Sequence, residues 1–279
     1  MKTTLRVITL VAIVFIISQT MAADSQFADL RAGKNFIETR TYSQEDDERI
    51  LKLFEGLRVA DVCDGMDAIG LKDVGLMNPD IHPLWRDTSN FTHRIVGIAV
   101  TARYIPTQQP FPSNLSVEQY DKWATEWYKN RSSEPFTQII RKGTVIVIEE
   151  APESDVGSIG SNNILSWKSR GCVGVVTSGT ARDTDEIILE KVPLYFKKPG
   201  PGIRPGRNEI ESVNRPIVCG GVTVMPGDVI VADGDGVVVV PRERAEEVAN
   251  YARKILEGDK IGRRNLYQKL GIPFDNSVK

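Results

Sequence analysis

The segment from residue 144 to residue 177 limits the possible folds of this chain more than any other. It contains two short apolar runs, TVIVI and VGVVT. Between them lie a Gly/Ser-rich stretch and a short helical pattern that ends at Gly171. Two buried strands joined by a helix form a parallel βαβ unit, and its crossover is right-handed. We therefore predict an α/β fold built around a central βαβ unit.

The loops that follow the two predicted strands carry the residues most suited to chemistry. They open on the same edge of the sheet, where ligands of open α/β sheets bind. The first loop ends in GSIGSNN at a helix N-terminus, whose free N–H groups favour an anion. The second delivers Arg182, suited to gripping a carboxylate, and Asp183, suited to a divalent cation such as Mg²⁺. We expect these groups to converge.

Each of these features also has a purely structural interpretation. A Gly-rich stretch before a helix is often only a tight turn, and an adjacent Arg–Asp pair is often only an ion pair. The acidic residues Asp183, Asp185 and Glu186 could equally begin a helix, whose dipole favours them. Only their convergence on one edge favours a functional site.

Hydrophobic periodicity predicts further elements on both sides of this unit. Helices are expected at 45–55, 59–69, 117–130 and 242–257, and strands at 94–104, at 192–197 and three times between 216 and 241. Residues 73–92 and 197–214 are expected to be loops. Trp123 and Trp127 lie on the apolar face of one helix, where packing is favoured over lining a pocket.

Several classes of function are disfavoured by composition and motif. The chain has 35 Lys and Arg against 37 Asp and Glu, which is not the basic excess of a nucleic-acid-binding protein. GSIGSNN lacks the Lys and Ser/Thr of a P-loop. Neither His82 nor His93 has a Ser or Cys in a nucleophile context. The sequence therefore gives no sign of nucleotide-loop or catalytic-triad chemistry.

Metal sites built from the remaining motifs are also disfavoured. The cysteines are odd in number, lie in apolar or Gly-rich surroundings and are expected to be small buried hydrophobes: Cys63, Cys172 and Cys219. Asp233, Asp235 and Gly236 resemble the start of a calcium loop, but Arg244 occupies the position where that loop needs Glu. We expect a tight turn between two strands there.

Positive charge gathers in the expected loop 197–214, at Lys197, Lys198, Arg204 and Arg207. A solvated loop is the simpler interpretation, and a second contact for an anion or for a neighbouring subunit is the alternative. Glu209 and Glu211 in the same stretch could act as an acid or a base.

The N-terminus has the pattern of an export signal. A positive start is followed by an apolar run over residues 7–17 and by small residues. We predict a signal peptide over residues 1–23, cleaved near Ala22 or Ala23, and a periplasmic or secreted protein that does not contact the membrane afterwards. An uncleaved anchor is the alternative. Residues 24–44 would form an arm, and 45–279 a single domain.

Three blocks of this sequence, in order, resemble the RraA-like family and its 4-hydroxy-4-methyl-2-oxoglutarate (HMG/CHA) aldolases. They are RVADVCDGMDAIG, GSIGSNNILSWKSRGCVGVVTSGTARDTDEI and NRPIVCGGVTVMPGDVIVADGDGVVVVP. The resemblance covers roughly residues 50–257 and is interrupted by an unusual segment at 105–140. It implies the RraA-like α/β/β swivelling-domain fold and a homotrimer or homohexamer with sites near the subunit interfaces.

The resemblance also implies roles for individual residues. Arg182 would bind the carboxylate of a small 2-oxo acid, and Asp183 would hold Mg²⁺ or Mn²⁺. The turn formed by Gly160, Ser161, Asn162 and Asn163 would help to hold the substrate. Many family aldolases have an acidic residue where this chain has Ser161, so one carboxylate near the metal is lost. Asp155, Asp185 or Glu186 could compensate.

The function that follows is that of a class II, metal-dependent aldolase or 2-oxo acid decarboxylase. It would release pyruvate from a 4-hydroxy-2-oxo acid or oxaloacetate. Two alternatives stay open: a non-catalytic RraA-like binding or regulatory protein, and a lyase that acts on sugar acids. An exported protein could not meet the cytoplasmic endoribonuclease that some relatives inhibit, so that regulatory role is disfavoured.

Overall fold

The fold is built around a mixed β-sheet. The structure is a computed structural model, and it describes residues 36–151 and 155–279. Within these ranges the strand order is β1-β7-β5-β3-β2-β12-β13, with β9 paired to one end of β2. Thr39–Lys279 forms one compact unit. The predicted signal peptide and most of the predicted arm lie outside the described residues. No described helix has the length and apolar character needed to span a membrane.

The predicted βαβ unit is present at the middle of the sheet. β3 (Thr144–Glu149) and β5 (Cys172–Thr177) are parallel neighbours, joined through α5 (Ser161–Ser169). β2 (Ile95–Pro106) is parallel to β3 on one side, and β7 (Leu194–Phe196) is parallel to β5 on the other. The carboxyl ends of four parallel strands therefore meet at one edge. This arrangement confirms the predicted α/β class.

Alternation along the strands divides the core between two faces of the sheet. In β3, Val145 and Val147 join the cluster under the hairpin of β10 (Ile217–Cys219) and β11 (Val222–Val224). Ile146 and Ile148 point the other way, into a cluster completed by Trp167 of α5 and by residues of α6 (Thr184–Leu189) and of the 3-10 helix η1 (Pro135–Gln138). Both faces are thus covered.

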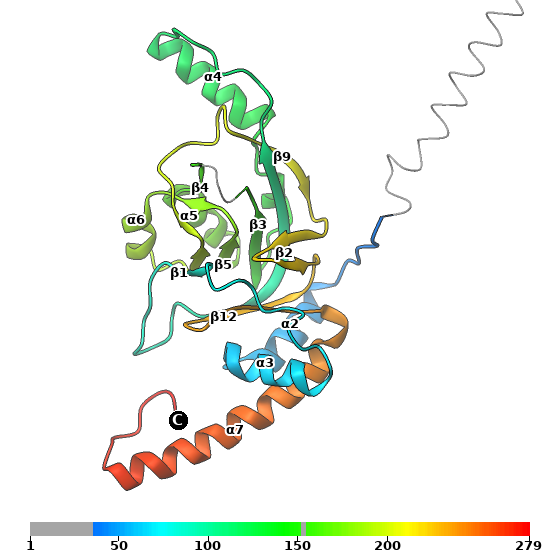
Figure 1. The fold of residues 1–279 in the computed structure, drawn as a ribbon, viewed down its shortest axis with the longest axis vertical. Coiled ribbons are helices and arrows are strands. Elements are labelled where there is room, and N and C mark those ends of the chain that lie inside the picture. Colours follow the sequence, from blue (N-terminus) through cyan, green and yellow to red (C-terminus); the bar gives the residue numbers. More distant parts are fainter. Residues whose placement is uncertain (1–35, 152–154) are drawn as a thin grey trace, which may run out of the picture. The chain divides into compact units, whose positions relative to one another are not determined.

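A helical layer covers the part of the sheet formed by β12 (Val229–Asp233) and β13 (Gly236–Val240) (Figure 1). It consists of α2 (Gln44–Phe54), α3 (Val59–Ala68) and α7 (Ala245–Leu270). Gly65 lets α3 approach α7 closely, because a Cβ there would lie 2.8 Å from the carbonyl oxygen of Val248. The short η2 (Arg242–Arg244) precedes α7.

Several predicted boundaries need correction. The expected loop 197–214 contains β8 (Lys198–Pro199) and β9 (Asn208–Val213), which pairs antiparallel with β2. The expected single strand at 216–224 is a hairpin that turns at Gly220 and Gly221, both at positive φ. The last helix runs on to Leu270. Within the expected loop 73–92, β1 (His82–Pro83) pairs with β7.

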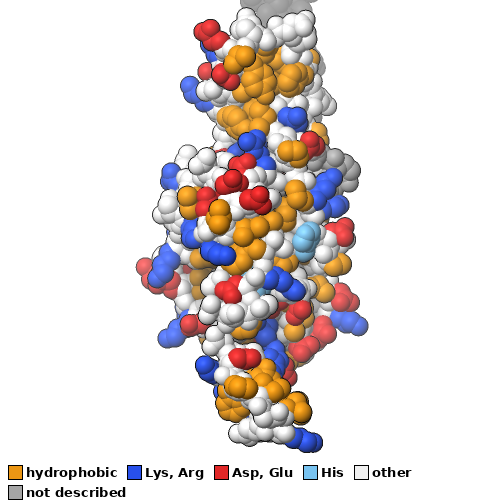
Figure 2. Space-filling model, turned by 90° about the vertical axis from the view of Figure 1, so that its left-hand side faces the viewer, with side chains coloured by type: hydrophobic (Ala, Val, Ile, Leu, Met, Phe, Trp, Pro, Cys, Tyr) orange, Lys and Arg blue, Asp and Glu red, His pale blue; other side chains and the backbone are white. Residues whose placement is uncertain are grey.

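The segment between β2 and β3 forms an arm around α4 (Val117–Asn130), which is separate from the predicted N-terminal arm. Ser116 caps the helix, and its aromatic residues pack together, with ring centroids 5.1 Å apart for Phe111 and Trp123 and 5.5 Å apart for Trp123 and Trp127. Figure 2 shows hydrophobic side chains gathered over this arm, where Phe111 and Val117 are exposed. The two tryptophans therefore pack within the arm, and Trp127 is buried.

Candidate active site

A small parallel sheet at the carboxyl edge brings the two predicted loops together. β4 (Gly157–Ile159) pairs with β6 (Thr180–Ala181), which pairs in turn with β8. The backbone N–H of Arg182 donates to the carbonyl oxygen of Ile159 at 2.8 Å. Sequence reasoning placed both loops on this edge, but it missed the three short strands, because they are too short to show periodicity.

The turn before α5 contacts the Arg–Asp pair directly. The backbone N–H of Ser161 donates to Asp183 Oδ2 at 3.2 Å. A Cβ on Gly160 would lie only 2.8 Å from the same oxygen, so any larger residue here would push the Asp183 carboxylate away from its observed position. Asp183 itself has φ +55°, a left-handed conformation that aspartate adopts more readily than most residues. The backbone is therefore shaped to hold this carboxylate against the start of α5.

Arg182 lies beside the same carboxylate. Its Nε donates to Asp183 Oδ1 at 3.2 Å, and both side chains are about one-third exposed, at 36% and 33%. One carboxylate thus accepts a backbone N–H on one oxygen and a guanidinium N–H on the other. The terminal nitrogens of Arg182 have no contact with another carboxylate among the described residues, so they can bind an anion from solvent.

The two asparagines of the turn differ in their surroundings. Asn162 is exposed on the first turn of α5, whereas Asn163 is half-buried and its Nδ2 donates to Glu134 Oε1 at 2.6 Å. Glu134 also accepts from Trp167 Nε1 at 2.9 Å. The structure therefore brings Gly160, Ser161 and Asn163 next to the Arg–Asp pair, and leaves the side chain of Asn162 facing solvent.

Glu134 belongs to a buried network that sequence reasoning missed. It pairs with Arg204, which is only 4% exposed and donates to the Tyr104 hydroxyl at 3.0 Å and to the carbonyl oxygen of Ser132 at 3.1 Å. The expectation of a solvated basic loop is thus wrong for Arg204, because it anchors the loop to the arm. Glu209, considered as an acid or base, is paired with Arg131 at 3.2 Å.

A second buried carboxylate supports β4 from behind. Glu150 is 3% exposed and accepts hydrogen bonds from Ser158 Oγ and Asn208 Nδ2. Its Oε2 has no hydrogen-bond partner within the described ranges. Burial raises the pKa of Glu150 to about 7, although both hydrogen bonds oppose this shift. The group is positioned to titrate near neutral pH.

This pKa predicts a pH-dependent stability. Because the folded-state pKa lies above the ordinary value of 4.5, the folded chain binds the proton more tightly than the unfolded chain. The stabilisation is fully present below about pH 4.5 and is lost as the pH rises through 7. We expect the free energy of unfolding to fall by roughly 3 kcal/mol over this range.

Glu150→Gln should reduce this dependence, because the amide cannot ionise, while Glu149→Gln, at the preceding residue, should leave it unchanged. Urea denaturation of the three proteins between pH 4.5 and pH 8 measures the slope. Equal slopes in the wild-type protein and Glu150→Gln would show that Glu150 is not the responsible group.

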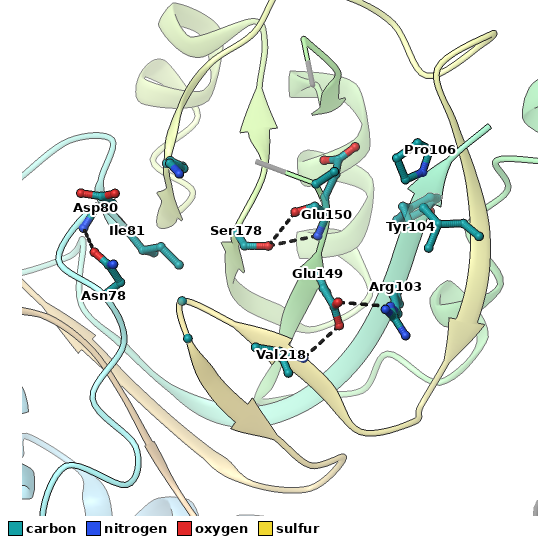
Figure 3. A pocket seen from close by; sticks show the side chains of 15 residues that line it. Asn78, Asp80, Ile81, Arg103, Tyr104, Pro106, Glu149, Glu150, Ser178 and Val218 are labelled. Atoms are coloured by element: carbon teal, nitrogen blue, oxygen red, sulfur yellow. Dashed lines mark hydrogen bonds and ion pairs between the residues drawn. The ribbon is translucent and has the colours of Figure 1, made fainter. Parts of the chain in front are cut away.

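A cavity of about 390 Å³ lies at the same edge, beside β10 and β11 (Figure 3). Glu149 points toward it and is held by Arg103 Nε at 3.1 Å and by the backbone N–H of Val218 at 2.9 Å. The Glu150 carboxyl group points the other way in Figure 3, while its backbone is held by the Ser178 hydroxyl. Neither Arg182 nor Asp183 is among the residues that line this cavity.

The donor atoms near Asp183 limit what kind of metal ion could bind. In the described part of the chain, no group of three or more His, Cys, Asp or Glu side chains is arranged so that it could hold a metal ion by itself. Asp183 is the carboxylate that the structure brings to the turn, with Asn163 beside it. Such a set fits Mg²⁺ or Mn²⁺, which often bind through one or two carboxylates and fill their remaining positions with water and substrate. It does not fit a structural zinc site.

The remaining sequence predictions have clear outcomes. Asp233 Oδ1 accepts from the backbone N–H of Asp235 at 2.9 Å, which confirms the predicted tight turn between β12 and β13. Cys172 and Cys219 are buried as expected, whereas Cys63 is half-buried. His93 is buried, with its Nδ1 bonded to the backbone N–H of Asp87, and His82 is exposed. The candidate chemistry therefore centres on Arg182 and Asp183.

The fold and this arrangement define a mixed α/β protein with a candidate small-molecule site at the carboxyl edge of its parallel strands. The family model described as RraA-like, Aldolase/RraA, matches residues 59–239. The chain therefore belongs to the RraA-like family, and its fold is the RraA-like fold.

Relatives and solved structures agree with this family. A putative 4-hydroxy-4-methyl-2-oxoglutarate aldolase of Halalkalibacterium halodurans is 34% identical over 113 residues, which are 40% of this chain and 53% of that protein. Protein DlpA of Legionella pneumophila is 28% identical over 194 residues, 68% of this chain and 27% of that protein. The chain thus spans about half or less of the length of these relatives.

A crystal structure of an uncharacterised protein from Pseudomonas syringae superposes with a TM-score of 0.61 at 27% identity, covering 81% of this chain and 94% of that one. Streptomyces coelicolor RraAS2, described as an unusual member of the RNase ES inhibitor RraA family, gives 0.61 at 22% identity, covering 81% and 99%. The latter likeness concerns the fold alone.

Proposed function

We propose that this chain is a divalent-metal-dependent carbon–carbon lyase that releases pyruvate from a 4-hydroxy-2-oxo acid or from oxaloacetate. The observation that carries the proposal is the convergence of three groups on one point. The Asp183 carboxylate accepts from the Ser161 backbone N–H and from Arg182 Nε, each at 3.2 Å. Relatives named as 4-hydroxy-4-methyl-2-oxoglutarate aldolases support the same reaction class.

Different residues bind different parts of the 2-oxo acid and its cation. The free nitrogens of Arg182 bind the substrate carboxylate, and backbone N–H groups of the Gly160–Asn163 turn orient it. Asp183 holds the cation, which supplies Lewis acidity where negative charge builds up as the C–C bond breaks. The hydrogen bond from Ser161 and the contact with Arg182 keep the Asp183 carboxylate in one orientation. Substrate and catalytic groups are thus fixed before the reaction begins.

Ser161 favours a second candidate function. It places a hydroxyl where many family aldolases have a carboxylate, so the cation is held by fewer negative charges. A non-catalytic protein that binds an organic acid through Arg182 and the turn is consistent with this loss. Three other carboxylates are the candidate replacements for the lost one. Asp185 and Glu186 lie exposed on α6, and Asp155 accepts a hydrogen bond from the backbone N–H of Gly202 at 3.3 Å.

Two further proposals concern the setting of the protein. The family resemblance supports a homotrimer or homohexamer, and the N-terminal pattern supports export to the periplasm or the medium, with cleavage near Ala22 or Ala23. Light scattering and N-terminal sequencing of the protein secreted by an expressing cell would test both.

The function is tested by pyruvate release from a panel of 4-hydroxy-2-oxo acids and oxaloacetate. We expect turnover with Mg²⁺ or Mn²⁺ that disappears in excess chelator and returns when the metal is restored. Turnover that persists in chelator would rule out the metal-dependent reaction. Organic-acid binding without pyruvate release from any substrate would favour the second candidate.

A further inference from the structure

A separate cavity of about 650 Å³ lies at the amino ends of the parallel strands, away from the Arg182 site. It is bounded by α2 on one side and by the first residues of β2, β3 and β5 on the other. Its floor is apolar and is formed by Leu51, Leu57, Val96 and Val173. Val173 is 37% exposed although it belongs to a central strand. The floor therefore presents hydrocarbon surface that a ligand can cover.

Arg94 lies at this cavity with its charge unneutralised. Its Nε is buried without a hydrogen-bond partner, and its guanidinium makes no ion pair with any carboxylate of the described chain. The contact recorded for the guanidinium is the Phe91 ring, whose centroid lies 3.9 Å away. Arg94 precedes β2 by one residue, so it shares a face with Val96, which packs toward the helical layer. The side chain is thereby directed to the cavity side.

Nearby carboxylates do not neutralise Arg94 because other groups hold them. Asp61 accepts from the backbone N–H, Nε and Nη2 of Arg58, at 2.5 to 2.9 Å. Asp233 accepts from the backbone N–H groups of Val59 at 3.0 Å and Asp235 at 2.9 Å. Burial lowers the pKa of Arg94, and these carboxylates offset the effect only from a distance. A half-buried cation without a carboxylate partner is costly, and a bound anion would reduce that cost.

The rim of the cavity adds two lysines to this arginine. Lys52 and Lys142 line the cavity together with two acidic residues, Glu48 and Glu55. Glu48 already accepts a hydrogen bond from Gln44 Nε2 at 3.1 Å. The three basic side chains outnumber the two acidic ones, and together with the apolar floor they favour a ligand that has an anionic group and a hydrocarbon body. The volume of the cavity is in the range of small-molecule sites.

We propose that this cavity binds a monocarboxylate with a medium-length hydrocarbon body, whose carboxylate pairs with Arg94 and whose body covers the floor at Val173. The proposal is independent of the lyase reaction, because none of its residues belongs to the Arg182 site.

Isothermal titration calorimetry with octanoate tests the proposal, with octylammonium and acetate as probes of charge and of the hydrocarbon body. Octanoate should bind at least tenfold more tightly than either. Arg94→Met should weaken octanoate binding at least tenfold and raise the melting temperature of the ligand-free protein, because it removes an unpaired charge while keeping the stem. Arg103→Met, at the opposite edge of the sheet, should leave octanoate binding unchanged.

Val173→Asp provides a second variant at a partly exposed position, and it should abolish octanoate binding by placing a negative charge on the floor. Equal binding of octanoate and octylammonium, or unchanged octanoate affinity in Arg94→Met, would overturn the proposal. A third outcome would also overturn it: the wild-type protein binds no octanoate, and its oligomer dissociates in Val173→Asp. A second copy of the chain would then cover the cavity. Light scattering distinguishes that outcome.

Discussion

We expect Arg182→Ala to lower kcat/KM for the proposed pyruvate release by about 10²–10³-fold, because the substrate carboxylate would lose two charge-assisted hydrogen bonds worth roughly 3–4 kcal/mol together. Arg182→Lys should recover less than a tenth of the lost activity, since an ammonium group cannot form the planar, two-point contact. The side chain is about one-third exposed, and within the described ranges its ion pair is with its neighbour Asp183, so neither variant should lower the melting temperature noticeably.

Arg170→Ala is the matched control, because Arg170 is exposed at the far end of α5 and carries the same charge. Steady-state kinetics on all four proteins, with circular dichroism for folding, gives the comparison. If Arg182→Ala and Arg170→Ala had the same kcat/KM, Arg182 would not bind the substrate, and the site would have to be sought elsewhere, starting with the cavity near Arg103.

The central βαβ unit was predictable because the signals that specify it are local. The apolar runs of β3 and β5 are continuous, and Gly171 ends the intervening helix at φ +112°. Both loops then had to open on one edge, so the proximity of Gly160 and Asp183 followed from topology alone. Their contact in the structure confirms this geometric prediction, while the chemical roles of the residues await experiment.

Elements that depend on distant partners could not be predicted in this way. β9 reads NEIESV and carries few apolar side chains, so its identity as a strand comes from pairing with β2. α7 continues through Gly258 and Gly262, which weaken a helix locally, into a stretch where Ile261, Leu266 and Leu270 are exposed. Hydrophobic periodicity is absent from both stretches, and backbone hydrogen bonding decides their structure.

Glu134 was missed for the same reason. It lies 29 residues from Asn163 and 70 from Arg204, and nothing around it in the sequence marks it as buried. It nevertheless accepts hydrogen bonds from Asn163 in the turn before α5 and from Trp167, and it forms an ion pair with Arg204. The polar link between the unusual segment 105–140 and the turn before α5 therefore runs through this carboxylate.

Glu134→Ala is expected to destabilise the protein by about 3–5 kcal/mol, because it leaves the buried Arg204 charge without its partner. It also removes the acceptor from Asn163 Nδ2 and Trp167 Nε1. Arg204→Met should cost less, since Glu134 then retains both of those donors and the Tyr104 hydroxyl still donates to the carbonyl oxygen of Ser133 at 2.8 Å. The order of the two effects follows from which group is left buried and unpaired.

The double variant Glu134→Ala/Arg204→Met separates this explanation from simple loss of packing. If an orphaned charge dominates, the double variant should be more stable than Glu134→Ala alone, because the unpaired guanidinium is gone. If packing dominates, the two losses should add.

Glu126→Ala is the control: Glu126 also accepts a hydrogen bond from an asparagine amide, at 2.7 Å, but on the exposed face of α4. Urea denaturation gives the free energies. If the proposed function holds, kcat/KM of Glu134→Ala should fall further than its stability explains, because Asn163 is no longer held in the turn before α5.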